Sequence, residues 1–187
     1  DLEGDRDFSH WRTRLQEIIQ QVNVPVIVKE VGFGMSAEVA NELQSMGVQW
    51  IDVGGKGGTN FIEVENSRRP LPMSDFVDYG FSTVESLLDL RGKHSLTVFA
   101  SGGVRGAYDI VKSLYLGADM VGLSGYFLKL VHQYSVSECI EITKQLIQDI
   151  KGIFAVLDVN HLQELRSKNV IYDNKLIQFM KQRGIKR

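Results

Sequence analysis

A short apolar strand, a glycine-rich turn and an amphipathic helix follow one another repeatedly, and this order constrains the fold more than any other feature. Residues 34–55 and 106–125 share it: each segment contains a helix, a glycine, a strand and a second glycine-containing turn. Repeats of this kind predict an α/β fold with a parallel sheet, either doubly wound or a (β/α) barrel.

Four segments fit the strands of such a sheet: 24–29, 48–53, 96–101 and 119–123. The continuous apolar run of the first predicts a strand buried on both faces. Apolar spacing predicts helices in five places: 8–22, 37–46 (with Ser36 as N-cap), 82–90, 107–116 and 136–157. We expect a long loop from Gly54 to about Gly80, a more polar helical tail over 160–187, and fraying of its last seven residues.

Four strands are half the number in a closed (β/α)8 barrel, which typically takes ~250 residues. The 187 residues therefore predict the C-terminal half of a single barrel domain, with the N-terminal half expected before Asp1. A half barrel leaves apolar sheet edges uncovered, which favours association into a homo-oligomer.

Composition excludes several classes of function. The 21 lysines and arginines nearly balance the 23 acidic residues, and the net charge of −2 does not suggest a nucleic-acid binder. Cys139 is the only cysteine, which excludes an internal disulfide and a zinc site built from thiolates and agrees with a cytoplasmic location. No apolar run approaches the ~18 residues of a membrane span, so we expect no membrane attachment.

Glycine turns follow the third and fourth predicted strands, at Ser101-Gly102-Gly103-Val104-Arg105 and Gly122-Leu123-Ser124-Gly125. In barrels, the loops after the last strands and the N-terminus of the next helix often bind a phosphate group. The alternative is that the glycines only let strands turn tightly into helices. Two successive turns at neighbouring strand ends favour phosphate binding.

Two further segments are candidates for a ligand site. Lys29 closes the first strand and is either a cation at the barrel mouth or a surface lysine. The loop 54–61 has enough glycine to let a flat ligand lie on the backbone, with Thr59 and Asn60 as hydrogen-bond donors or acceptors, or it is simply flexible. Glu63 and Glu65 point the same way if their segment is extended and diverge if it is helical.

Histidine chemistry has little support. None of the four histidines, at positions 10, 94, 132 and 161, directly follows a predicted strand, so no histidine-based catalytic pair is apparent. Cys139 lies inside a predicted helix, where we expect it to be packed.

The runs from Val24 to Met35 and from Gly57 to Phe61, and the Ser101–Arg105 turn with Leu116-Gly117-Ala118-Asp119, resemble the FMN-dependent type 2 isopentenyl-diphosphate delta-isomerases over nearly the whole chain. The opening Glu3–Phe8 also suits this family. The last motif is shared with FMN-linked α-hydroxy-acid oxidases and inosine-monophosphate dehydrogenase-like barrels, whereas the first two are more specific.

The resemblance implies a TIM barrel of the FMN-linked type, of which this chain supplies about the last four βα units. It implies interconversion of isopentenyl and dimethylallyl diphosphate in isoprenoid biosynthesis, with reduced FMN as the acid–base cofactor, NAD(P)H as reductant and Mg²⁺ on the substrate. By position it assigns FMN contacts to eight residues: Lys29, Gly54, Thr59, Gly102, Gly103, Arg105, Leu123 and Ser124. Family members often carry serine at position 54, so a hydroxyl contact would be lost there.

The same resemblance assigns Glu65 as an active-site carboxylate and Phe61 as an aromatic wall beside the substrate. The Mg²⁺ ligand, a catalytic glutamine and the substrate-diphosphate binders would lie upstream of Asp1, so we expect no metal ligand in these residues and no turnover by this chain alone. The family also implies a tetramer or octamer. Two alternatives stay open: an α-hydroxy-acid oxidase relative, which would need a histidine in the 54–61 loop, and a non-catalytic flavin- or phosphate-binding half barrel.

Overall fold

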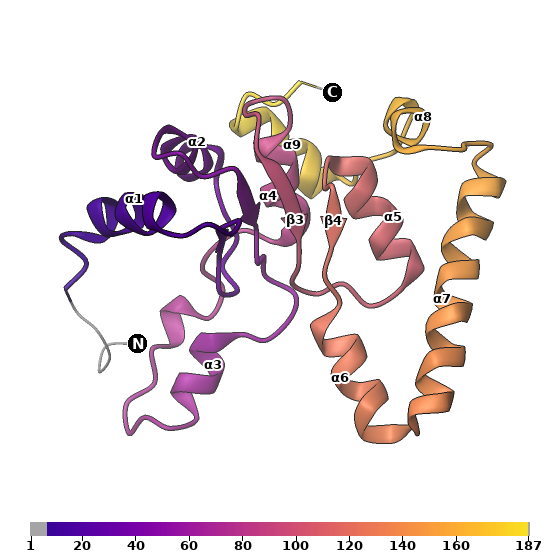
Figure 1. Cartoon of the computed structure of the whole chain (residues 1–187), viewed down its shortest axis with the longest axis horizontal. Coiled ribbons are helices and arrows are strands. Elements are labelled where there is room, and N and C mark those ends of the chain that lie inside the picture. Colours follow the sequence, from indigo (N-terminus) through magenta and orange to yellow (C-terminus); the bar gives the residue numbers. More distant parts are fainter. Residues whose placement is uncertain (1–6, 187) are drawn as a thin grey trace.

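The computed structural model describes residues 7–186 and contains a parallel four-stranded sheet in the order β1-β2-β3-β4. The strands are β1 (Ile27–Lys29), β2 (Trp50–Asp52), β3 (Thr97–Ala100) and β4 (Met120–Val121). Helices α2 (Ala37–Ser45), α4 (Thr83–Leu90) and α5 (Ala107–Leu116) connect successive strands (Figure 1). The predicted α/β repeat is therefore confirmed, with strands shorter than the apolar runs that contain them.

The remaining elements lie around this unit. They are α1 (Trp11–Gln21), α3 (Phe61–Asn66), the 3₁₀ helix η1 (Ser74–Phe76), α6 (Ser124–Gln133), α7 (Val136–Val156), α8 (Leu162–Ser167) and α9 (Asn174–Gln182). The segment 54–80 is thus not one irregular loop, because α3 and η1 interrupt it. In Figure 1 the carboxyl end of β4 leads down into α6, and α3 lies on the same lower side. Within residues 7–186, no helix has both the length and the apolar character that crossing a bilayer demands.

The two faces of the sheet have different surroundings. Val28, Ile51 and Val98 are register partners on the face covered by helices, where Ile51 is fully buried and Val98 is 2% exposed. The opposite, inner face carries Ile27 and Met120, which are 48% and 56% exposed. The prediction that the first strand is buried on both faces is therefore wrong, because the described residues cover only one face of the sheet.

Side-chain caps fix where the connecting helices begin. Ser36 caps α2, as predicted, and Ser82 caps α4 with a reciprocal hydrogen bond from its backbone N–H to Glu85. Ser135 and Glu138 form the same capping box at the start of α7. Gly117 ends α5 at a φ of 119°, a left-handed conformation that glycine adopts without a Cβ penalty.

The C-terminal tail folds back onto the outer layer of helices. The ring of Phe179 in α9 packs edge-on against Phe81, with the centroids 5.4 Å apart. Beyond α9, Ile185 packs against the main core, and Arg183 binds the buried carboxylate of Asp89. The prediction that residues 181–187 fray is wrong for residues 181–186, because a buried carboxylate needs a cationic partner and Arg183 supplies it.

Candidate functional site

A cavity of about 890 Å³ lies at the carboxyl ends of the four strands. Its volume falls within the range that ligand and cofactor sites usually have. Eight of the residues predicted for the site line it: Lys29, Gly54, Thr59, Phe61, Gly102, Gly103, Arg105 and Ser124. The turns after all four strands thus meet at one place, as the end-to-end arrangement of parallel strands requires.

The glycines of this cavity allow the turns to stack backbone against backbone. Gly102 has a φ of +96°, and a Cβ there would lie 2.0 Å from the carbonyl oxygen of Gly55. A Cβ on Gly54 would lie 2.2 Å from the carbonyl oxygen of Glu30. The glycines therefore bring three strand-end turns together, so the simple alternative of a flexible 54–61 loop does not describe Gly54 and Gly55.

One end of the cavity is suited to an anion. Helix α6 begins at Ser124 with no side-chain cap and no acidic residue in its first turn, so its first N–H groups are available to a ligand. Ser124, Gly125 and Tyr126 of that turn line the cavity. Two cationic side chains, Arg105 and Lys129, line the same cavity. Lys129 was not singled out in the sequence, although it lies only one helical turn beyond Gly125.

Lys29 lies at the other end of the cavity. Its ammonium donates a hydrogen bond of 2.7 Å to the carbonyl oxygen of Glu30 and lies 3.8 Å from the carboxylate of Asp52. The side chain is 54% exposed, so the ammonium reaches the cavity. Asp52 is a site residue that the sequence reasoning missed, although it closes its strand with a charge just as Lys29 does.

The loop after β2 uses its two polar residues differently. Asn60 caps α3: its Oδ1 accepts hydrogen bonds from the N–H groups of Ile62 and Glu63, and its Nδ2 donates to the carbonyl oxygen of Val77. These bonds occupy Asn60 in holding the loop, so the expectation that it serves a ligand is not supported. Thr59 and the half-exposed ring of Phe61 line the cavity.

Glu65 and Leu123, which were predicted for the site, do not line the cavity, and neither does the further candidate Glu63. Glu63 and Glu65 belong to α3, so their side chains diverge, and Glu65 lies 3.8 Å from the guanidinium of Arg68. Leu123 packs its side chain into a small apolar cluster with Val104 and Ile110. A contact from Leu123 to a ligand would therefore come from its backbone.

The backbone of Phe81 connects the turns after β1 and β2, and the sequence reasoning also missed this role. Its N–H donates to the carbonyl oxygen of Phe33 at 2.7 Å, and its carbonyl oxygen accepts from the N–H of Lys56 at 2.9 Å. Glu30 holds the turn after β1 by accepting hydrogen bonds from the N–H groups of Gly32 and Phe33. The Glu30 contacts are local, whereas those of Phe81 link positions far apart in the chain, which no local motif reveals.

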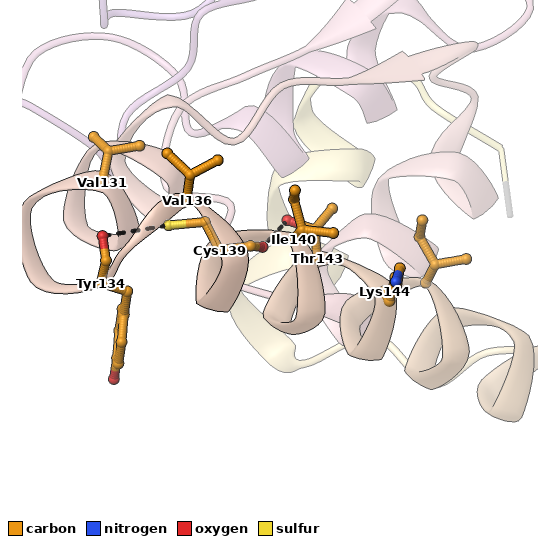
Figure 2. A pocket seen from close by; sticks show the side chains of 8 residues that line it. Val131, Tyr134, Val136, Cys139, Ile140, Thr143 and Lys144 are labelled. Atoms are coloured by element: carbon orange, nitrogen blue, oxygen red, sulfur yellow. Dashed lines mark hydrogen bonds between the residues drawn. The ribbon is translucent and has the colours of Figure 1, made fainter.

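A second, smaller hollow of about 380 Å³ lies between α6 and α7 (Figure 2). It is mostly apolar, with Val131, Val136 and Ile140 on its walls, and the thiol of Cys139 lies 3.8 Å from the carbonyl oxygen of Tyr134. Cys139 is half-buried inside α7. Among the described residues, Lys144 is the one charged residue that lines this hollow, and no glycine turns converge on it. We therefore take the strand-end cavity as the candidate functional site.

A parallel sheet with a glycine-rich, cationic cavity at its strand ends is typical of the α/β barrels that bind phosphate-bearing cofactors. Comparison with known families agrees: the FMN-dependent dehydrogenase family matches residues 4–172. The chain belongs to this family of FMN-dependent proteins. Within residues 7–186, no group of three His, Cys, Asp or Glu side chains is arranged to hold a metal ion.

Curated relatives give a narrower comparison. The chain is 46% identical to the isopentenyl-diphosphate delta-isomerase of Staphylococcus haemolyticus over 98% of its length, covering 53% of that protein. It is 42% identical to the protein of the same name from Listeria welshimeri, covering 52% of it. The resemblance drawn from the sequence is confirmed, and the chain spans about half the length of these relatives.

Solved structures share the fold. A flavocytochrome b2 mutant with benzoylformate superposes with a TM-score of 0.64 over 89% of this chain and 42% of its own, at 22% identity. Mandelate oxidase with (S)-4-hydroxymandelic acid gives 0.62 over 84% of this chain and 40% of its own, at 13% identity. At these identities the likeness concerns the fold alone, and it confirms that the four-stranded unit fits part of an α/β barrel.

Proposed function

We propose that the strand-end cavity binds FMN and that this chain contributes the cofactor site of an enzyme that interconverts isopentenyl and dimethylallyl diphosphate. One observation carries the proposal: a single cavity joins the uncapped start of α6 and Arg105 at one end to Lys29 at the other. FMN has a dianionic phosphate at one end and a ring that becomes electron-rich on reduction at the other. The names of relatives at 40–46% identity support the choice of reaction.

The residues fit the two ends of this cofactor. Gly102, Gly103, Arg105 and Ser124, with the backbone of Leu123, would hold the phosphate, because they combine free N–H donors with a guanidinium. Gly54, Thr59 and Lys29 would lie along the ring, with the ammonium of Lys29 stabilising negative charge there. Bound and reduced, FMN supplies a ring nitrogen that exchanges the proton moved in the isomerisation.

Phe61 and Glu65 would serve the substrate. Phe61 presents a half-exposed ring to the cavity and would wall off water from an apolar isoprenoid chain. We keep Glu65 as the acid–base carboxylate; its side chain is mostly buried and lies within 3.8 Å of Arg68, so that pairing would have to give way for it to reach substrate. This role requires a movement of the side chain or of α3.

Several parts of the proposal concern the whole enzyme. It would use NAD(P)H to reduce FMN and Mg²⁺ to bind the substrate diphosphate, in a cytoplasmic homo-oligomer of four or eight copies. The exposed apolar side chains on the inner sheet face, Ile27 and Met120, support association with further protein. Because the chain spans about half of its relatives, we propose that it does not sustain turnover alone.

The isomerase accounts for the site better than a hydroxy-acid oxidase does. Oxidation of a hydroxy acid requires a base that removes a proton from the substrate, and histidine is the usual one. None of the histidines at positions 10, 94, 132 and 161 lines the cavity. The loop 54–61, where an oxidase relative would need its histidine, contains Lys56 and Thr59 but no histidine.

The experiment is a titration of the purified chain with FMN and with riboflavin, followed by flavin fluorescence. We expect binding of FMN in preference to riboflavin, because riboflavin lacks the phosphate. Assays with reduced FMN, isopentenyl diphosphate and Mg²⁺, and with lactate or glycolate, then separate the reactions. Indifference of the cavity to FMN would refute the cofactor site, and sustained isomerisation by these residues would refute the proposed need for more chain.

A further inference from the structure

Asp52 lies between the strand ends that form the candidate site, but the proposed contacts to the cofactor give it no role. It is the last residue of β2, and its register partners are Lys29 on β1 and Phe99 on β3. Paired residues of parallel strands point to the same face, so Asp52 shares the inner face with Lys29. Its side chain is only 15% exposed, and a carboxylate this enclosed requires partners.

The partners of Asp52 come from three strand ends. Its Oδ1 accepts a hydrogen bond of 3.0 Å from the N–H of Gly54, in the turn after β2. The hydroxyl of Ser101 donates to the same carboxylate, 2.7 Å from Oδ1 and 2.9 Å from Oδ2, at the end of β3. The ammonium of Lys29, at the end of β1, lies 3.8 Å from Oδ2. A single carboxylate therefore connects the turns that form the cavity.

These contacts also direct Lys29. An ammonium has three N–H donors. One is used by the carbonyl oxygen of Glu30, and the attraction of Asp52 holds the group on the inner face of the sheet. The remaining donor capacity is available to a group in the cavity, which Lys29 lines.

We infer that Asp52 is a positioning residue, which holds the Lys29 ammonium and the Ser101–Gly102 turn in place for the flavin and partly offsets the positive charge that Lys29 presents to the ring. The inference rests on the proposed FMN site. It assigns to Asp52 two separable effects: hydrogen bonds that keep the turns together, and a negative charge that acts on the reduction of the bound flavin.

Two variants separate these effects. Asp52→Asn keeps the size and one oxygen acceptor but removes the charge. Ser101→Ala removes the hydroxyl and leaves every charge in place. Asp119→Asn is the matched control, because Asp119 also accepts a backbone N–H, from Val98, and pairs with Arg166 at 3.4 Å, but contacts neither Lys29 nor Ser101.

The measurements are the dissociation constant of FMN and the midpoint potential of bound FMN. We expect Asp52→Asn to shift the midpoint potential to more positive values, because the Lys29 charge then acts unopposed on the reduced ring. We expect Ser101→Ala to weaken FMN binding about two- to tenfold, the factor that one hydrogen bond represents, without this shift. Asp119→Asn should leave both quantities at their wild-type values.

A purely structural role for Asp52 would lower the melting temperature and leave the potential of bound FMN unchanged, which overturns the inference. If Asp52→Asn gives no folded protein, the test rests on Ser101→Ala. An unchanged FMN affinity in Ser101→Ala then also overturns the inference. Failure of the wild-type chain to bind FMN at all refutes the proposed function and this inference together. Binding by the wild type without an effect of the variants refutes the inference alone.

Discussion

Arg183 and Asp89 are 94 residues apart, yet the guanidinium donates hydrogen bonds to both carboxylate oxygens, at 3.0 and 2.7 Å. Asp89 is fully buried in α4 and also accepts from the N–H of Ala37, at the start of α2, and from the ammonium of Lys93. Burial alone would raise the pKa of Asp89, but the hydrogen bonds from Arg183, Ala37 and Lys93 outweigh it and hold the pKa below the usual value. The end of the chain is thus fastened to two helices of the outer layer.

Substitution of Arg183 by methionine should destabilise the fold by about 3–5 kcal/mol, because it leaves the buried Asp89 without its main cationic partner. Urea unfolding followed by circular dichroism measures the change. Arg14→Met, on the exposed side of α1, serves as the control and should stay within about 0.5 kcal/mol of the wild type. Equal midpoints for the two variants would show that the Arg183 contacts contribute little.

Acidification below pH 6.5 should weaken the fold through His94. Burial lowers the pKa of His94 and outweighs the opposing attraction of Asp119. The unfolded chain, where the pKa is about 6.5, then binds the proton first, so stability is fully present above that pH and falls as the pH drops through the lowered pKa of the folded state.

The test compares the free energy of unfolding at pH 7.5 and 5.5. His94→Asn should reduce the difference, because asparagine does not bind a proton in this pH range. Its side-chain oxygen is able to accept the hydrogen bond that Leu96 N–H now donates to the ring, so the local contact is kept. His132→Asn, at an exposed position of α6, should not. The same pH dependence in wild type and His94→Asn would contradict the prediction.

Arg105→Ala should lower the affinity for FMN about 10- to 100-fold, the factor expected for a charge-assisted hydrogen bond, and leave riboflavin binding nearly unchanged. The reason is that Arg105 lines the end of the cavity where the phosphate would lie. Lys112→Ala removes an exposed cation from α5, away from this cavity, and should bind both flavins as the wild type does. An equal loss for FMN and riboflavin would place Arg105 elsewhere than at the phosphate.

Gly102→Ala should destabilise the chain by about 2 kcal/mol or more and abolish flavin binding. Its φ of +96° is unfavourable for alanine, and the added Cβ would overlap the carbonyl oxygen of Gly55. Gly152→Ala is the matched change at an exposed position in the last third of α7, where no atom lies within 4 Å of an added Cβ, and should stabilise by about 0.5–1 kcal/mol. Thermal unfolding and FMN titration give both results, and a wild-type melting temperature for Gly102→Ala would count against the stacked-turn description.

Features encoded over a few residues could be predicted from the sequence. The Ser36 cap, the Gly117 helix end and the two glycine turns at 101–105 and 122–125 depend on neighbouring residues only. The order of strands and helices follows from apolar spacing for the same reason. The meeting of the predicted residues in one cavity follows in turn from the parallel sheet, since all four strands end on the same side.

Features that depend on distant partners could not be predicted. Asp52 looks like an ordinary strand-end acid until β3 brings Ser101 beside it, and Phe81 lies in a turn with no motif of its own. Asn60 is a different case: its bonds to the N–H groups of Ile62 and Glu63 are local, as in any N-cap, but the sequence analysis expected a loop there and not a helix. Only its bond to the carbonyl oxygen of Val77 depends on a distant residue. Burial of the first strand was overestimated because an apolar run does not say what lies on each side of it.

The inner sheet face also carries Trp50, which is partly exposed beside Ile27 and Thr97 on the neighbouring strands. The other tryptophan, Trp11, lies on α1 and packs against the helical side of the core. The emission maximum of an indole ring shifts when water is excluded from it. The fluorescence of Trp50 therefore reports whether another molecule or protein segment covers the inner sheet face. Replacing Trp11 by phenylalanine would isolate its signal and make docking on the inner face visible without any added label.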